Sequence, residues 1–392
     1  MKTILVCFAC LLLFHAQARA QLNSLTPKEA AEGWVLLFDG ESMFGWTPEG
    51  GAEWRVVDGA LVADRGESGY LRSNAVFADY ILKCEFRSAP DGNSGIFLRS
   101  AKLGQPHVTG YELQIYDQHE KFKTGSLVNH AVAKPARITG GWQSYEVELR
   151  GDRILVRLDG KKVLETRDSK SLVGHIGLQY NKGKKIEFRN LKVKPLGLAP
   201  IFDGKTLAGW RETKHPRAKE PPTWSVRNGL LHVEKGPGQL ETEATFDDFV
   251  LQIDIRANAP APDKHPNSGI FLRGEPNVSW SGYESQIRNE YKDGDCTQPV
   301  DFGTGGIYHY QPARKVVAND NQFFTKTIVA RGRHFSVWVN GFPVTSWEDP
   351  HPEGNNVRQK QAKLTPGVIS LQAHDPTTNL DFKNIRIARL PR

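Results

Sequence analysis

The sequence has little cysteine, little methionine and no long apolar run in its body. Its 392 residues include four cysteines and two methionines, against 37 glycines and 23 prolines. So few cysteines exclude a disulfide-stapled scaffold, and the lack of a sustained 3.6-residue period excludes a long coiled coil. Beyond the first twenty residues no segment is apolar enough to span a bilayer. The composition therefore predicts a turn-rich, globular β protein.

Strong charge of one sign is also absent. The formal net charge is +7, from 51 basic and 44 acidic residues, and basic and acidic residues alternate along the chain. Two short basic spots, 182–185 and 331–333, are typical of solvated turns. Without an arm or stripe that could follow phosphates, we expect no nucleic-acid partner.

The motifs of several large enzyme classes are missing. The sequence has no P-loop and no G-x-G-x-x-G cradle, so we expect no nucleotide cofactor. It also has no G-x-S-x-G elbow, which argues against a serine hydrolase of that type.

The first twenty residues have the pattern of a secretory signal peptide. Lys2 precedes an apolar run from Ile4 to Phe14, and Ala18-Arg19-Ala20 follows it. We expect cleavage before Gln21 and a secreted or periplasmic protein; a membrane anchor is the alternative. Cleavage would leave Cys84 and Cys296. Cys84 lies on the apolar face of an alternating strand and is expected to be a buried free thiol, although a bridge to Cys296 stays open.

The rest of the chain contains two copies of one domain. The seven residues Asn93 to Arg99 recur unchanged as Asn267 to Arg273, and several shorter matches occur in the same order in both copies. The expected domains are 34–195 and 198–392. Their linker is short, so we expect the two domains to touch.

Each copy has the pattern of short antiparallel strands. Alternating apolar residues in 145–149, 154–158 and 249–255 predict strands with one buried face. Asp-Gly and Asn-Gly pairs between such runs predict tight hairpins; they are Asp58-Gly59, Asp159-Gly160, Asn228-Gly229 and Asn340-Gly341. The only helix expected is short, at 27–32. We predict two jelly-roll-like β-sandwiches in tandem, each with a concave sheet open to a ligand.

Period-2 alternation sorts polar residues onto one face of the second copy. Glu284 and Gln286 share a face, as do Gln372 and His374, and Arg273 ends a neighbouring strand. A carboxylate, amides, a guanidinium and an imidazole suit the hydroxyl groups of a sugar, while Trp280 and Tyr308 could stack on its ring. An ordinary solvated strand face is the alternative interpretation.

The repeated motifs resemble the 3-keto-disaccharide hydrolase domain family. They are Phe-Asp-Gly followed by Gly-Trp, Asn-Ser-Gly-Ile-Phe-Leu-Arg, Gly-Tyr-Glu-x-Gln-Ile and Gly-x-Ile-x-Leu-Gln. The resemblance covers both copies and implies the concanavalin A-like lectin/glucanase sandwich. It also implies a carbohydrate ligand.

The two copies depart from the family pattern at different positions. The second keeps Leu-Gln-x-His, ending at His374, where the first has Asn181. The first keeps the family's Asp, as Asp117, where the second has Asn289. The connections after Arg256, Ile287 and Gly341 are longer than their first-copy counterparts, and long loops on a rigid sandwich are where binding sites form. We therefore expect the site in the second copy, with the first supporting it or binding glycan.

The substrate class that the resemblance implies suggests a mechanism. A ketone at C3 of a sugar acidifies the C2–H bond, so a base can remove that proton and expel the C1 substituent. In this scheme His374 is the base, Arg273 or a bound cation stabilises the enolate, and Glu284 orients substrate or ligates the cation. The expected substrate-binding residues are Asn267, Gln286, Gln372, Tyr308, Glu112, Gln114 and Arg99.

Two alternatives remain open. One is ordinary glycosidase chemistry with Glu284 and Glu290 as paired carboxylates, and the other is a non-catalytic tandem glycan-binding protein. No cofactor is certain, but a divalent cation is compatible with several side chains. These are Glu284, Glu290, Asp295, His309 and His374, and no spacing among them is diagnostic.

Overall fold

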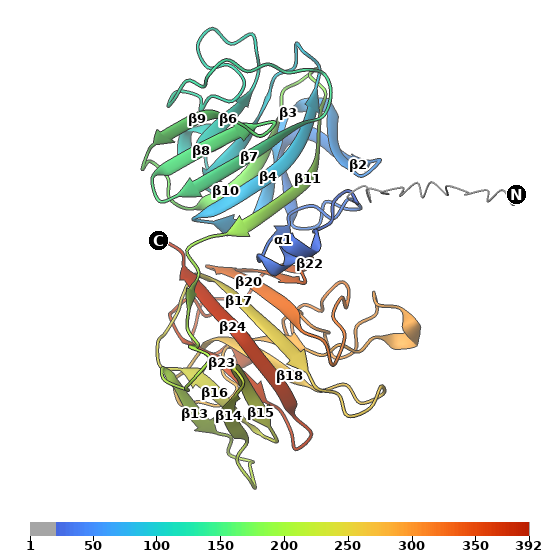
Figure 1. Ribbon diagram of the computed structural model, residues 1–392, viewed down its shortest axis with the longest axis vertical. Coiled ribbons are helices and arrows are strands. Elements are labelled where there is room, and N and C mark those ends of the chain that lie inside the picture. The colour runs from blue at the N-terminus through green and yellow to red at the C-terminus, as the bar shows by residue number, and fades with distance from the viewer. Residues whose placement is uncertain (1–20, 392) are drawn as a thin grey trace, which may run out of the picture.

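The computed structural model describes residues 21–391. The signal peptide expected at 1–20 lies outside the described residues. Two β-rich domains stack along the long axis of the molecule, and α1 (Pro27–Ala31) lies at the junction between them (Figure 1). The short helix expected at 27–32 is thus confirmed. Within residues 21–391 no helix is long and apolar enough to cross a membrane.

The second domain is a sandwich of two antiparallel sheets. The larger sheet runs in the order β14-β15-β24-β17-β20-β21-β22, with β12 pairing β24, and the smaller sheet runs β13-β16-β23-β18-β19. The strands of the larger sheet are β12 (Ala199–Pro200), β14 (Thr223–Arg227), β15 (Leu230–Glu234), β17 (Phe249–Ala257), β20 (Phe324–Arg331), β21 (His334–Val339), β22 (Phe342–Glu348) and β24 (Asn379–Arg389). The smaller sheet holds β13 (Trp210–Lys214), β16 (Gly238–Thr242), β18 (Ser268–Gly274), β19 (Tyr283–Ile287) and β23 (Val368–Ala373). Short 3-10 turns occur at Lys292–Gly294 and Val357–Gln359.

The first domain repeats this plan with longer strands. Its strands are β1 (Val35–Leu36), β2 (Trp46–Val57), β3 (Ala60–Phe77), β4 (Tyr80–Ser88), β5 (Ser94–Ser100), β6 (Tyr111–Ile115), β7 (Gln143–Arg150), β8 (Arg153–Leu158), β9 (Lys161–Arg167), β10 (Gly174–Tyr180) and β11 (Ile186–Pro195). A short helix, α2 (Pro106–Thr109), precedes β6. The long strands β2 and β3 extend through both layers of this sandwich. The strands of the two layers are therefore hydrogen-bonded into one continuous sheet, in the order β6-β5-β10-β3-β11-β4-β7-β8-β9.

The predicted fold is confirmed in both domains. All four predicted turn pairs have positive φ at both residues, for example 49° at Asp58 and 73° at Gly59, as a type I′ hairpin requires. The inward residues of β17 are fully buried, and so is the apolar face of β4 that carries Cys84. Cys84 and Cys296 are both free thiols, so the alternative of a bridge between them is wrong.

The two domains share a packed interface, as the short linker predicts. Trp338 of β21 is 4% exposed and packs into the core of the first domain. Its indole donates to the carbonyl of Leu36 at 2.7 Å, while Arg314 pairs with the buried Asp39 at 2.8 Å. This contact brings β21 and β22 against one end of the first domain.

Candidate functional site

Strand register places the predicted polar residues in two rows across the smaller sheet of the second domain. Paired residues on neighbouring antiparallel strands point to the same face. Gln239 pairs with Gln372, and Gly269 pairs with Gln286. In the adjacent row, Phe271 pairs with Glu284. The core side chains of these strands, such as Tyr283 and Ile287, are fully buried on the other face, so the alternation sorted the two faces correctly.

Glu284 sits at the centre of this polar face. Its carboxylate packs over Gly269, where a Cβ would lie 2.3 Å from Glu284 Oε1, and it hydrogen-bonds to the Gln372 side chain. Burial, followed by the nearby charge of Asp301, raises the pKa of Glu284 to about 7, although Lys326 and Arg358 act against the shift. A carboxyl group with this pKa can both donate and accept a proton near neutral pH.

His374 lies just beyond the end of β23, at the rim of the same face. Its Nδ1 is 2.8 Å from Asp375 Oδ2, and its Nε2 is 3.5 Å from the Asn267 side-chain nitrogen. The ring is parallel to that of Trp280, with an interplanar angle of 1° and centroids 5.6 Å apart. The carboxylate on Nδ1 favours the tautomer whose Nε2 lone pair is free to accept a proton.

Asp301 connects the side-chain amides of the site to the aromatic residue Tyr308. Its Oδ2 accepts hydrogen bonds from Asn267 at 3.2 Å and from Gln286 at 3.0 Å. It also accepts from the Tyr308 hydroxyl, and burial together with the charges of Asp301 and Glu284 raises the pKa of that phenol. Sequence reasoning missed Asp301, because it lies in an irregular loop where period-2 alternation gives no signal.

All three long loops of the second domain reach this face. The connection between β17 and β18 supplies Asn267. The connection between β19 and β20 supplies Asp301 and Tyr308. The connection between β22 and β23 supplies Arg358, which donates to the Trp280 carbonyl and lowers the pKa of Glu284. The loop residues Trp280, Asp301 and His309 all have positive φ, a costly conformation that concentrates at functional sites.

Some buried acceptors at the site lack a partner. Asn267 Oδ1 and Gln372 Oε1 have no hydrogen-bond partner among residues 21–391. A buried acceptor without a hydrogen bond costs free energy. These two oxygens are therefore suited to accept hydrogen bonds from the hydroxyl groups of a ligand.

The structure does not bring Arg273 to this cluster, which corrects the expected catalytic role. Its guanidinium is 0% exposed and donates to the carbonyls of Asp247, Gly332 and Lys363 and to Asp248 Oδ1. The register of β18 shifts between Phe271 and Gly274, and this bulge turns Arg273 away from the face on which strict alternation would place it.

Arg99 makes the equivalent contacts in the first domain, so it is not positioned to bind substrate either. It is 0% exposed and donates to the carbonyls of Ala78, Gly151 and Ser171 and to Asp79 Oδ1. In both copies the arginine of the repeated motif ties loops together beneath the sheet.

The first domain keeps the amide and carboxylate part of the site. Glu112 accepts from Gln179 at 3.0 Å, and burial raises the pKa of Glu112 while the nearby His107 and His119 act against the shift. Gln114 Oε1 has no partner within the described part of the chain. Asn181 stands where the second domain has His374, and its amide donates to Asn93 Oδ1 at 3.1 Å.

The Asp-to-Asn difference between the copies concerns a loop contact. Asp117 accepts from Thr124 Oγ1 and from the Ile138 amide. Asn289 likewise accepts from Thr304 Oγ1, and its amide donates to Asp320. Both residues hold the loop that follows the strand, so the substitution in the second domain removes no group from the polar face.

The carboxylate pair Glu284 and Glu290 does not form one strand face. β19 ends at Ile287, and Glu290 is bound to Arg288. In residues 21–391 no three His, Cys, Asp or Glu side chains gather as they would around a metal ion, so the five metal-ligand candidates do not form a cluster.

Comparison with known proteins agrees with the repeat. The model of a 3-keto-alpha-glucoside-1,2-lyase-like domain matches residues 33–194 and again 197–388. A 3-keto-disaccharide hydrolase of Bacteroides thetaiotaomicron is 25% identical over 181 residues, covering 43% of this chain and 54% of the relative. The chain therefore spans about half the length of this curated relative.

Solved structures are similar to part of the chain. A candidate glycosyl hydrolase of Parabacteroides distasonis is 25% identical, covers 45% of this chain and 100% of its own, and has a TM-score of 0.41. The carbohydrate-binding module CBM66 of Bacillus subtilis is 22% identical, covers 38% of this chain and 94% of its own, and has a TM-score of 0.31.

Proposed function

The chain belongs to the 3-keto-alpha-glucoside-1,2-lyase-like domain family over both of its domains, and we propose that the second domain cleaves 3-keto-glycosides. The observation that carries the proposal is that two groups occur at the same sheet face: a carboxyl group, Glu284, whose pKa is raised to about 7, and at the rim a histidine, His374, oriented by Asp375.

The proposed reaction is an elimination followed by addition of water. His374 Nε2 removes the proton from C2, and the C–H electrons move toward the C3 ketone to form an enolate. When the enolate collapses, a C1–C2 double bond forms and the C1–O bond breaks. The departing oxygen takes a proton from Glu284, which its raised pKa keeps partly protonated. Water then adds at C1 while C2 regains a proton, so the net change is hydrolysis.

The remaining polar groups are suited to holding the substrate. Asn267 Oδ1 and Gln372 Oε1 offer unpartnered acceptors to sugar hydroxyl groups, and Trp280 and Tyr308 provide aromatic surface. The Gln286 side chain donates to Asp301 and so links the loop that carries Asp301 to the sheet. Arg273 takes no part, because its guanidinium is fully engaged below the sheet. A divalent cation is not part of the proposal, because no set of three ligating side chains gathers at Glu284 among residues 21–391.

A second candidate, non-catalytic glycan binding, is favoured by the first domain. Its face keeps Glu112, Gln114 and Gln179 but has Asn181 in place of the base. Tyr70 lies on the same face, edge-on to Phe97 with ring centroids 5.5 Å apart. We propose that this face binds glycan without cleaving it.

The test is release of a chromogenic leaving group from a 3-keto-glucoside by purified protein that spans residues 21–392. We expect His374→Ala and Glu284→Gln each to lower kcat by about 10²–10⁴-fold, with both variants folded by circular dichroism. Glu112→Gln is the matched control in the first domain and should retain activity. Chelator treatment reports separately on a metal.

Absence of release by the wild-type protein, with saturable binding of glycans, would instead support a tandem binding protein. Equal loss of activity in Glu112→Gln and Glu284→Gln would contradict the assignment of catalysis to the second domain.

A further inference from the structure

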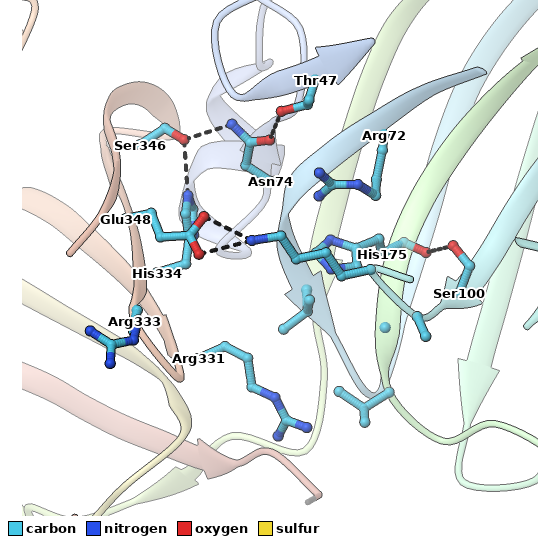
Figure 2. A pocket seen from close by; sticks show the side chains of 15 residues that line it. Thr47, Arg72, Asn74, Ser100, His175, Arg331, Arg333, His334, Ser346 and Glu348 are labelled. Atoms are coloured by element: carbon cyan, nitrogen blue, oxygen red, sulfur yellow. Dashed lines mark hydrogen bonds and ion pairs between the residues drawn. The ribbon is translucent and has the colours of Figure 1, made fainter. Parts of the chain in front are cut away.

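A polar cavity lies where the two domains meet. Its volume is about 570 Å³, within the range of small-ligand pockets. One wall comes from β2, β3, β5 and β10 of the first domain, and the other from β20, β21 and β22 of the second (Figure 2). This cavity is separate from the Glu284 site and shares no lining residue with it.

Direct contacts between the domains build the cavity. The Asn74 side-chain amide donates to Ser346 Oγ at 3.1 Å, and Lys102 Nζ pairs with Glu348 at 2.8 Å. Figure 2 shows Ser346 and Glu348 reaching across from the second domain toward the first. Neither domain alone would form this cavity, so it is a product of the tandem arrangement.

Positive charge exceeds negative charge in the lining. Four cationic side chains line it, namely Arg72, Lys102, Arg331 and Arg333, against one carboxylate, Glu348. Arg72 and Arg331 have carboxylate partners, Glu49 and Asp248, that lie outside the lining.

Arg333 differs from the other three cations. It donates to the His351 carbonyl, and across residues 21–391 no carboxylate pairs with it. The lining therefore has an excess of positive charge that a small anion could neutralise.

The remaining lining groups suit hydroxyl groups. His175 Nδ1 donates to the Ser73 carbonyl at 2.7 Å, which leaves the lone pair of a neutral ring on Nε2. Burial, followed by the charge of Arg72, lowers the pKa of His175 to about 4, and burial lowers the pKa of His334 to about 4 as well. Both rings are thus neutral near pH 7. His175 offers Nε2 as an acceptor, whereas the nitrogens of His334 already face Ser346 Oγ and Ser336 Oγ at 3.2 and 3.4 Å. Thr47, Asn74 and Ser346 add hydroxyl and amide groups that are also bonded to one another.

The cavity also continues the polar face of the first domain. Thr47 pairs with Arg72, Arg72 with Gly177, and Gly177 with Phe97. Phe97 in turn pairs with Glu112. A saccharide lying along this row from Glu112 would reach the cationic cavity at the other edge of the sheet.

We propose that the cavity between the domains binds a uronic acid residue, with its carboxylate on the cationic groups and its hydroxyls on the imidazole, amide and hydroxyl groups. This inference does not depend on cleavage of 3-keto-glycosides. It adds a second carbohydrate site, specific for acidic sugars, to the tandem protein.

Calorimetric titration with methyl α-D-glucuronide, methyl α-D-glucoside and sodium sulfate tests this proposal. We expect the glucuronide to bind at least tenfold more tightly than the glucoside. Arg333→Gln should weaken glucuronide binding about tenfold, whereas Arg333→Lys should retain most of it. Glu348→Gln should strengthen binding, because it removes the only carboxylate of the lining.

Two control variants show whether glucuronide binding is local to this cavity. Arg65→Gln removes an exposed arginine on the first domain and should leave glucuronide binding unchanged, as should Glu284→Gln. Unaltered melting temperatures would show that the variants are folded.

Equal affinity for glucuronide and glucoside, or no effect of Arg333→Gln, would overturn the proposal. Sulfate that competes at equal affinity would identify a simple anion site and would overturn the sugar specificity. Because none of these titrations measures cleavage, their outcome is independent of the proposed reaction.

Discussion

A buried lysine distinguishes the second domain from the first at the level of single residues. Lys326 is 0% exposed, and its Nζ donates to the carbonyls of Gln286 and Ser285 at 2.8 and 3.2 Å. Tyr145 takes this position in the first domain, where its hydroxyl donates to the Gln114 carbonyl at 2.9 Å. Both side chains support the strand that carries the site carboxylate, but only the lysine brings charge beneath it.

The charge of Lys326 acts on Glu284. Burial lowers the pKa of Lys326 to about 7, and Glu284 opposes that shift. Conversely, Lys326 holds down the pKa of Glu284, which burial raises. Lys326 is therefore a positioning residue that tunes the proposed acid from below the sheet.

Replacing Lys326 with the residue of the first domain should shift the pH profile of cleavage. In Lys326→Tyr the hydrogen bond to the strand can persist, but Glu284 loses a nearby cation and its pKa rises. The alkaline limb of kcat, which reports loss of the proton from Glu284, should move up by about one pH unit. Rate profiles of wild type, Lys326→Tyr and Glu284→Gln provide the measurement. An unmoved limb in Lys326→Tyr would rule out this coupling.

The same pair should make stability depend on pH in two opposite ways. Glu284 binds its proton more tightly in the folded chain, so its contribution to stability falls as pH rises from 4.5 to about 7. Lys326 binds its proton less tightly when folded, so its contribution rises from about pH 7 to 10.5. Denaturant unfolding at several pH values should show that Lys326→Tyr gains stability over wild type most strongly below pH 7 and loses this advantage above pH 10.

At the level of elements, both domains place an arginine on a β-bulge and bury it. Arg99 and Arg273 have φ of 51° and 55°, and the neighbouring strands shift register beside them. Their bonds join the bulged strand to the turn after β7 in one domain and after β20 in the other. The motif thus fixes loops around each sandwich.

Removal of either arginine should destabilise its own domain. Arg273→Met and Arg99→Met each remove the guanidinium partner of Asp248 or Asp79 and the side-chain donors of several carbonyls, at a cost of about 3–5 kcal/mol. Asp248 keeps Arg331 and the Gly332 amide, and Asp79 keeps the Gly151 amide. Differential scanning calorimetry should show matched losses in the two variants. Cleavage of the 3-keto-glucoside per folded molecule should survive in Arg273→Met under stabilising conditions. A specific loss of kcat with normal stability would instead support a catalytic role for Arg273.

At the level of the whole molecule, the two domains are packed against each other. Trp338 packs against Phe77, with ring centroids 6.3 Å apart, and the Gln252 amide donates to the Gly33 carbonyl at 2.8 Å. The segment with α1 fills the junction, where Leu36 donates to the Gly341 carbonyl at 2.8 Å. Apolar burial and these hydrogen bonds together fix the geometry of the cavity between the domains.

Truncation of the interface tryptophan should uncouple the domains. Trp338→Ala removes a buried ring and the hydrogen bond to Leu36, at a cost of about 3–5 kcal/mol. Calorimetry should then resolve two unfolding transitions in place of one, and glucuronide binding should fall with the cavity. A single transition with unchanged binding would show that Trp338 does not hold the domains together.

The sequence was sufficient for the features that depend on local pattern. Period-2 alternation identified the buried face of β17 and the outward positions of Glu284 and Gln286, because a strand has only two faces. The Asp-Gly and Asn-Gly pairs located the hairpins, since few residues tolerate positive φ. The exact repeat of Asn-Ser-Gly-Ile-Phe-Leu-Arg established that the chain contains two related domains.

Only the tertiary structure decided which polar residues share a site. A bulge turned Arg99 and Arg273 inward, against the alternation that predicted them on the face. An irregular loop brought Asp301 to Gln286, and β20 placed Lys326 beneath Glu284 from far along the chain. The cavity between the domains depends on their packing. These features arise from long-range contacts, whose geometry and electrostatics no local pattern of residues encodes.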